Sequence, residues 1–120
     1  PYADFVMATD AAVGEVLAAL KANGLEENTL VVFTSDNGCS PQADIPSLVK
    51  LGHNPSHVFR GHKADIYEGG HRVPFIVRWP GKVPAGAKTD RTVCLTDITA
   101  TCAELAGAKL PDDVGEDSIS

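Results

Sequence analysis

The stretch at residues 29–39, TLVVFTSDNGC, decides the fold class of this sequence. An apolar, β-branched run is followed by an acid, an amide and a glycine, which are Asp36, Asn37 and Gly38. A short continuous apolar run bounded by turn residues is typical of a strand that is buried on both faces. Because ligands bind beyond the carboxyl ends of strands in open α/β sheets, Asp36 and Asn37 are candidate ligands of a hard cation. Asp-Asn-Gly is also an ordinary turn sequence.

A helix is predicted before this strand and a second strand after it. Apolar residues at helical spacing indicate a helix over residues 4–23, and Asn23-Gly24 would end it. The segment at residues 74–79, PFIVRW, predicts the second strand. Between the strands, residues 40–61 lack periodicity and contain three prolines, so we expect a long loop, a feature that is usually functional.

The last third of the sequence predicts one more helix. It would run to Ala106, with Thr96 or Asp97 as its cap. Cys102 falls in this helix beside apolar residues and is expected to be a small core residue. The acidic residues after Pro111 predict a solvated tail.

These elements define an α/β protein with helices packed on a few strands of an incomplete mixed sheet. Two strands are too few for a sheet that is covered on both faces, and each would leave an unpaired edge. We therefore expect the missing strands to come from another part of a longer protein or from a second copy of the chain. The second possibility predicts a homo-oligomer that forms through open sheet edges.

Composition excludes several classes of partner. The 120 residues suit one domain, and 43% of them are hydrophobic. A net charge of -6 argues against nucleic acid or an anionic membrane as a partner. No apolar run approaches the roughly 20 residues that a membrane span needs. The three cysteines form no Cys-x-x-Cys pair, so neither a zinc knuckle nor a disulfide framework is indicated.

A second group of functional candidates lies in residues 61–74, GHKADIYEGGHRVP. Gly69-Gly70 indicates either a close backbone approach or a positive φ. Lys63 could hold an oxyanion, although a lysine taken by itself is usually a solvated surface residue. His53 and His57, in the long loop, either face a substrate or are simply exposed. With His62 they could also suggest zinc, but no cysteine or carboxylate pattern completes such a site.

The order of these segments resembles one family. TLVVFTSDNG, a variable loop, GHKADIYEGGHRVPFIVRWPG and TDITATCAELAG are together similar to the C-terminal part of the catalytic domain of a type I, formylglycine-dependent sulfatase. This is the arylsulfatase family of the alkaline-phosphatase-like superfamily. The resemblance extends from about Tyr2 to Ser120 and implies a partial alkaline-phosphatase-like fold.

The resemblance also implies site roles. Asp36 and Asn37 would be ligands of an active-site Ca²⁺, or Mg²⁺ in some members, and Lys63 would be the catalytic residue that contacts the sulfate. The substrate would be a sulfate ester, with sulfated polysaccharides as one class. The family suggests a periplasmic, extracellular or lysosomal location. Arg72 would have a structural role, pairing with a carboxylate or with backbone carbonyls.

Other parts of the family pattern are not found in the sequence. The formylglycine nucleophile is made in a Cys/Ser-x-Pro-x-Arg motif, but the stretch that begins at Cys39 has Ala43 where the arginine belongs. Residues 1–120 are therefore expected to be a fragment of a catalytic domain, without its N-terminal nucleophile motif and its C-terminal subdomain. We expect this fragment to be inactive alone.

Two alternatives to a sulfatase stay open at this point. A phosphatase, phosphonate hydrolase or phosphotransferase of the same superfamily would share the Asp-Asn metal site. A non-catalytic segment that folds only by self-assembly would have no metal.

Overall fold

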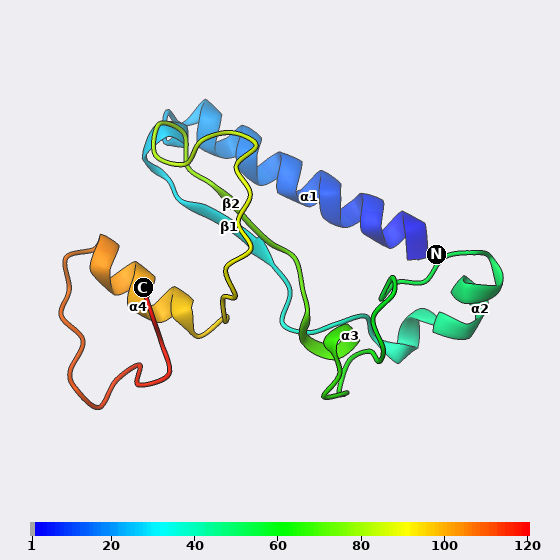
Figure 1. Ribbon diagram of the computed structural model, residues 1–120. Coiled ribbons are helices and arrows are strands. Elements are labelled where there is room, and N and C mark those ends of the chain that lie inside the picture. Colours follow the sequence, from blue (N-terminus) through cyan, green and yellow to red (C-terminus); the bar gives the residue numbers. More distant parts are fainter. Residues whose placement is uncertain (1) are drawn as a thin grey trace. The chain divides into compact units, whose positions relative to one another are not determined.

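The computed structural model describes residues 2–120, which fall into two compact units, residues 2–87 and residues 88–120. The second unit contains one helix, α4 (Asp97–Leu105). The first unit contains, in chain order, α1 (Tyr2–Ala22), the short 3-10 helix η1 (Glu26–Asn28), β1 (Val31–Thr34), the 3-10 helix η2 (Pro41–Ala43), α2 (Ile45–Lys50), α3 (Glu68–His71) and β2 (Phe75–Arg78) (Figure 1).

Both predicted strands are present, and they pair with each other. β1 and β2 are antiparallel, with Val31 opposite Arg78 and Thr34 opposite Phe75. An ion pair between Arg78 and Glu26 ties the end of β2 to η1. The α/β class is therefore confirmed, with a small open sheet. The pairing places the residues that follow β1 next to the residues that precede β2, and both candidate site segments lie there.

Burial differs from the prediction for the central strand. All four residues of β1 are half-buried rather than buried on both faces, because the described sheet has one partner strand and no second layer over it. Within residues 2–120 only Gly69 and Gly70 are buried. Large apolar side chains are open to solvent, and Phe5 of α1 is 75% exposed. The first unit therefore has apolar surface but no buried apolar core.

The loop between the strands contains two helices that the sequence did not predict. The three prolines of residues 40–61 favour a loop, yet Pro46 lies in the first turn of α2, where its missing N–H has no intrahelical partner to lose. α3 contains Gly69 and Gly70, which disfavour a helix in isolation. Both predicted longer helices are confirmed as α1 and α4. The described chain contains no helix that is long and apolar enough to cross a membrane.

The second unit is held by contacts between the tail and the start of α4. The Asp97 carboxylate accepts hydrogen bonds from the backbone N–H groups of Cys94, at 2.8 Å, and Ile119, at 3.0 Å. The Ser118 hydroxyl donates to the Thr96 carbonyl at 2.7 Å and accepts the Ala100 N–H at 2.9 Å. The acidic residues of the tail are exposed, as the sequence predicted, and the last residues of the tail also bind donors and acceptors at the helix start.

Of two further predictions for this helix, the one for Cys102 is wrong and the one for the cap is confirmed in position only. Cys102 is exposed, not a core residue, because α4 is the only helix or strand described in its unit. Thr96 occupies the N-cap position without a side-chain capping bond, and its hydroxyl donates to the Asp117 carbonyl at 3.2 Å instead.

The stability of this unit should depend on the ionisation of Asp97. The two backbone N–H donors, first Cys94 and then Ile119, hold the pKa of Asp97 below its ordinary value of 3.8. A carboxyl whose pKa is lowered on folding stabilises the fold above the unfolded pKa, and this contribution is lost as the pH falls through the folded pKa. We expect the amide signals of Cys94 and Ile119 to shift between about pH 5 and pH 2 in NMR spectra.

Asp97→Asn should remove this pH dependence because the amide does not titrate. Asp90→Asn, in the same unit, is the matched control and should leave it in place. Amide signals of Cys94 and Ile119 that do not move over this pH range in the wild-type chain would contradict the assignment.

Candidate active site

Asp36 and Asn37 lie in the loop that follows β1. Local hydrogen bonds fix the shape of this loop. The Ser35 hydroxyl donates to the Asn37 carbonyl at 3.0 Å, and the Asn37 side-chain nitrogen donates to the Gly38 carbonyl at 3.0 Å. Asn37 is half-buried and Asp36 is exposed. The Asn37 nitrogen is therefore occupied within the loop, which leaves its side-chain oxygen as the atom that could bind a cation.

Lys63 lies in a tight turn formed by residues 62–65. The backbone N–H of Asp65 donates to the His62 carbonyl at 2.9 Å, and the Asp65 carboxylate accepts the backbone N–H of His62 at 3.0 Å. Ala64 has φ 74°, a left-handed conformation that is uncommon for alanine. The Lys63 side chain is exposed. The sequence signal for Asp65 is its spacing, because an Asp three residues after His62 suits a side-chain-to-backbone turn bond.

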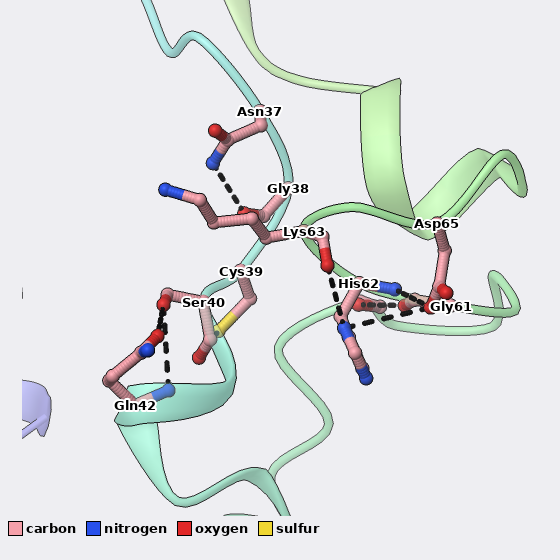
Figure 2. A network of polar contacts seen from close by, with 10 residues as sticks. Asn37, Gly38, Cys39, Ser40, Gln42, Gly61, His62, Lys63 and Asp65 are labelled. Atoms are coloured by element: carbon pink, nitrogen blue, oxygen red, sulfur yellow. Dashed lines mark hydrogen bonds and ion pairs between the residues drawn. The ribbon is translucent and has the colours of Figure 1, made fainter.

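Two backbone hydrogen bonds bring these loops together. The N–H of Lys63 donates to the Cys39 carbonyl at 2.9 Å, and the N–H of Gly38 donates to the Gly70 carbonyl at 2.8 Å. Figure 2 shows the Lys63 side chain extending toward the segment that carries Asn37 and Gly38. Lys63 and Asn37, 26 positions apart in the sequence, thus lie on adjoining loops, and the lysine side chain extends toward the loop that carries Asn37.

The candidate histidines lie elsewhere in the first unit. The His53 ring contacts the Tyr2 ring, with centroids 5.2 Å apart, and the His57 ring meets the Phe59 ring edge-on at 6.4 Å. His57 lines a groove of about 1330 Å³ together with Asn37 and Arg72. Asp36, Lys63 and His53 are not among the residues that line this groove. The structure therefore brings Asn37 and His57 to one groove, and Lys63 to the loop beside it.

Arg72 has the structural role that the sequence predicted. Its guanidinium pairs with the Glu68 carboxylate at 2.9 Å and lies 4.6 Å from the centre of the Phe59 ring. The Arg72 backbone N–H donates to the Glu68 carbonyl at 2.8 Å. These contacts close the single turn of α3 and hold it against the long loop.

The side chains of Asp36 and Asn37 offer oxygen ligands, which a hard cation prefers. Two side chains are too few to complete its coordination. Ca²⁺ takes roughly 6–8 oxygen ligands, and these two side chains supply a minority of them. Across residues 2–120 no group of three His, Cys, Asp or Glu side chains could hold a metal ion. The described residues therefore fit one part of a cation site, and the other ligands would have to come from groups beyond them.

Cys39 has the properties of a structural thiol. Burial raises the pKa of Cys39, which disfavours the thiolate that a nucleophile needs. Its sulfur points to the Ser40 carbonyl, 3.6 Å away. This agrees with the mismatch at Ala43 in the sequence motif.

Comparison with known proteins identifies the family. A sequence model of the sulfatase family matches residues 1–108. Steryl-sulfatase of Rattus norvegicus is 44% identical over 112 residues, which are 93% of this chain and 19% of the relative. N-acetylgalactosamine-6-O-sulfatase of Bacteroides thetaiotaomicron is 39% identical over 120 residues, covering 96% of this chain and 23% of the relative. The chain belongs to the sulfatase family.

Solved structures agree with this assignment. A structure from work on the metabolism of multiple glycosaminoglycans by Bacteroides thetaiotaomicron has a TM-score of 0.82 and 38% identity, and it covers 93% of this chain and 24% of that one. The PsFucS1 sulfatase from Pseudoalteromonas sp. has a TM-score of 0.74 and 38% identity, covering 92% and 21%. The fold is thus part of the alkaline-phosphatase-like fold of sulfatases. The chain spans about a fifth of the length of the curated relatives it matches.

Proposed function

We propose that this sequence supplies part of the active site of a formylglycine-dependent sulfatase that hydrolyses sulfate esters. Asp36 and Asn37 bind a divalent cation, Ca²⁺ or Mg²⁺, and Lys63 binds the sulfate group. The observation that carries the proposal is the backbone hydrogen bond from Lys63 to Cys39, which brings the lysine loop to the Asp-Asn loop.

The residue types suit the charge changes of sulfate-ester hydrolysis. Negative charge builds on the ester oxygens as the S–O bond breaks, and a bound divalent cation supplies Lewis-acid stabilisation of that charge. The Lys63 ammonium provides a second positive centre and donates hydrogen bonds to the sulfate oxygens. Asp36 contributes a charged oxygen and Asn37 a neutral one, so together they hold a cation without neutralising it.

In this proposal the other active-site groups come from sequence outside residues 1–120. The relatives are about five times as long as the matched stretch, so most of their residues have no counterpart here. The formylglycine nucleophile and the remaining metal ligands belong to that larger part. The 120-residue chain then corresponds to the C-terminal part of a catalytic domain and is inactive by itself.

We propose a sulfated saccharide as one substrate class. One similar solved structure, with a TM-score of 0.75 and 40% identity, is Ps i-CgsB in complex with k-i-k-neocarrahexaose, and it covers 90% of this chain and 22% of that one. His53 and His57 lie in the long loop after β1 and are exposed. They are the candidates for contact with the part of the substrate beyond the sulfate.

A calcium titration tests the metal assignment. We expect the 120-residue chain to bind Ca²⁺ at millimolar concentration or more weakly in calorimetry, because Asp36 and Asn37 alone supply too few ligands. In the complete enzyme, Asp36→Ala should remove most of the gain in melting temperature that Ca²⁺ gives to chelator-treated protein. Glu15→Ala, an exposed acid on α1, is the control and should keep that gain.

Two results would contradict the metal assignment. One is micromolar binding by the 120-residue chain that Asp36→Ala abolishes, since the chain would then complete its own site. The other is an unchanged Ca²⁺ effect in the Asp36→Ala enzyme.

A second candidate function is self-assembly without catalysis. It is favoured by the exposed apolar side chains of the first unit and by the two-stranded sheet, each strand of which has one unpaired edge. Light scattering during size-exclusion chromatography separates the candidates. A defined oligomer that forms without metal supports self-assembly, and a monodisperse monomer excludes it.

A further inference from the structure

Three backbone segments meet at the candidate site with no side chain between them. The N–H of Gly38 donates to the Gly70 carbonyl at 2.8 Å, and the N–H of Gly69 donates to the Arg60 carbonyl at 2.8 Å. Gly69 and Gly70 are the buried residues of this part of the chain. We call this contact among Gly38, Gly69 and Gly70 the glycine junction.

The junction requires the absence of a Cβ atom at all three positions. A Cβ on Gly38 would lie 1.8 Å from the Gly69 carbonyl oxygen, and one on Gly69 would lie 2.1 Å from the Gly61 carbonyl oxygen. A Cβ on Gly70 would lie 2.0 Å from the Asp65 carbonyl oxygen. Each clash is with backbone, so no side-chain rotation relieves it. None of the three has a positive φ, so close approach, not backbone conformation, explains these glycines.

The position of the junction links it to the proposed site on both sides. Gly38 follows Asn37 directly, so the hydrogen bond to Gly70 fixes the end of the Asp-Asn loop. A Cβ on Gly69 or Gly70 would meet the backbone of Gly61, His62 and Asp65. These three residues frame the turn that carries Lys63 (Figure 2). A displacement at the junction would therefore move Lys63 relative to Asn37.

We infer that Gly38, Gly69 and Gly70 are positioning residues, whose backbone contact sets the distance between the sulfate-binding lysine and the metal-binding loop. The inference rests on the proposed function for the roles of Lys63 and Asn37. The backbone contact itself does not depend on those roles, so the two can be tested separately.

Amide hydrogen exchange in the complete enzyme tests the contact. The N–H groups of Gly38 and Lys63 should exchange about 10²-fold more slowly than that of Ala64, which has no acceptor among the described residues. Gly70→Ala should remove the protection of both amides. Rapid exchange of the Gly38 and Lys63 amides in the wild-type complete enzyme would overturn the inference, even if the variant does not fold.

Kinetics of the complete enzyme test the positioning role. Gly70→Ala should lower kcat at least about 10-fold with a smaller change in KM, and this loss should shrink when Lys63 is already alanine. An equal loss in both backgrounds would mean a purely structural role and would overturn the inference. If Gly70→Ala does not fold, Asp65→Ala, which frees the His62 N–H in the lysine turn, replaces it with the same two outcomes. If Lys63→Ala alone leaves kcat unchanged, the proposed role of Lys63 fails. The amide-exchange measurement still decides whether the backbone contact at the glycine junction exists.

Discussion

Replacing Lys63 with alanine in the complete enzyme should lower kcat for a sulfate ester by about 10²-fold or more. In the proposed function the Lys63 ammonium stabilises the charge that develops in the transition state, and loss of such an interaction typically has an effect of this size. The backbone contact between Lys63 and Cys39 does not involve the side chain, so the substitution should leave the fold intact. Steady-state kinetics with an aryl sulfate measure the change.

The matched control for this substitution is Lys50→Ala. Lys50 is an exposed lysine at the end of α2, in the same unit. Its removal tests whether any loss of positive charge lowers activity, and we expect kcat to stay near the wild-type value. Near wild-type kinetics in Lys63→Ala would instead remove Lys63 from the proposed site.

Gly38→Ala should have the largest effect on stability. Its Cβ would overlap the Gly69 carbonyl oxygen, and both segments are backbone. We expect the free energy of unfolding to fall by about 3 kcal/mol or more, the upper part of the range for overpacking, since neither segment can move without breaking the hydrogen bond from Gly38 to Gly70. Denaturant unfolding of the complete enzyme, followed by circular dichroism, measures the loss.

Gly14→Ala provides the opposite control. Gly14 lies inside α1 and no atom lies within 4 Å of a Cβ built there. Alanine at an unobstructed helix position should raise the free energy of unfolding by about 0.5–1 kcal/mol. Equal effects of the two substitutions would mean that glycine flexibility, not the close contact, determines the result at Gly38.

The fold class and the long helices were predictable because their signals are local. The apolar stripe of α1 and the β-branched run of β1 are visible within a few residues. α2 and α3 were missed because local rules penalise Pro46 and the pair Gly69-Gly70. Pro46 is tolerated by its position in the first turn, and the glycines are required by a tertiary contact.

Burial was the property that the sequence predicted least well. An apolar strand such as β1 indicates a residue set that can be buried, but burial also needs other elements to cover it. Cys102 was likewise expected in the core because of its apolar neighbours, but it is exposed. The candidate site shows the same limit, because the proximity of Lys63 to the Asp-Asn loop depends on hydrogen bonds between segments that are far apart in the sequence.

Selectivity between sulfate and phosphate esters tests the central claim most directly. The complete enzyme would be assayed with p-nitrophenyl sulfate and p-nitrophenyl phosphate, alongside its Asp36→Ala variant. The account predicts a higher kcat/KM for the sulfate ester, and a loss of about 10²-fold or more in Asp36→Ala. Preferred hydrolysis of the phosphate ester, or near wild-type sulfate hydrolysis by Asp36→Ala, would contradict it.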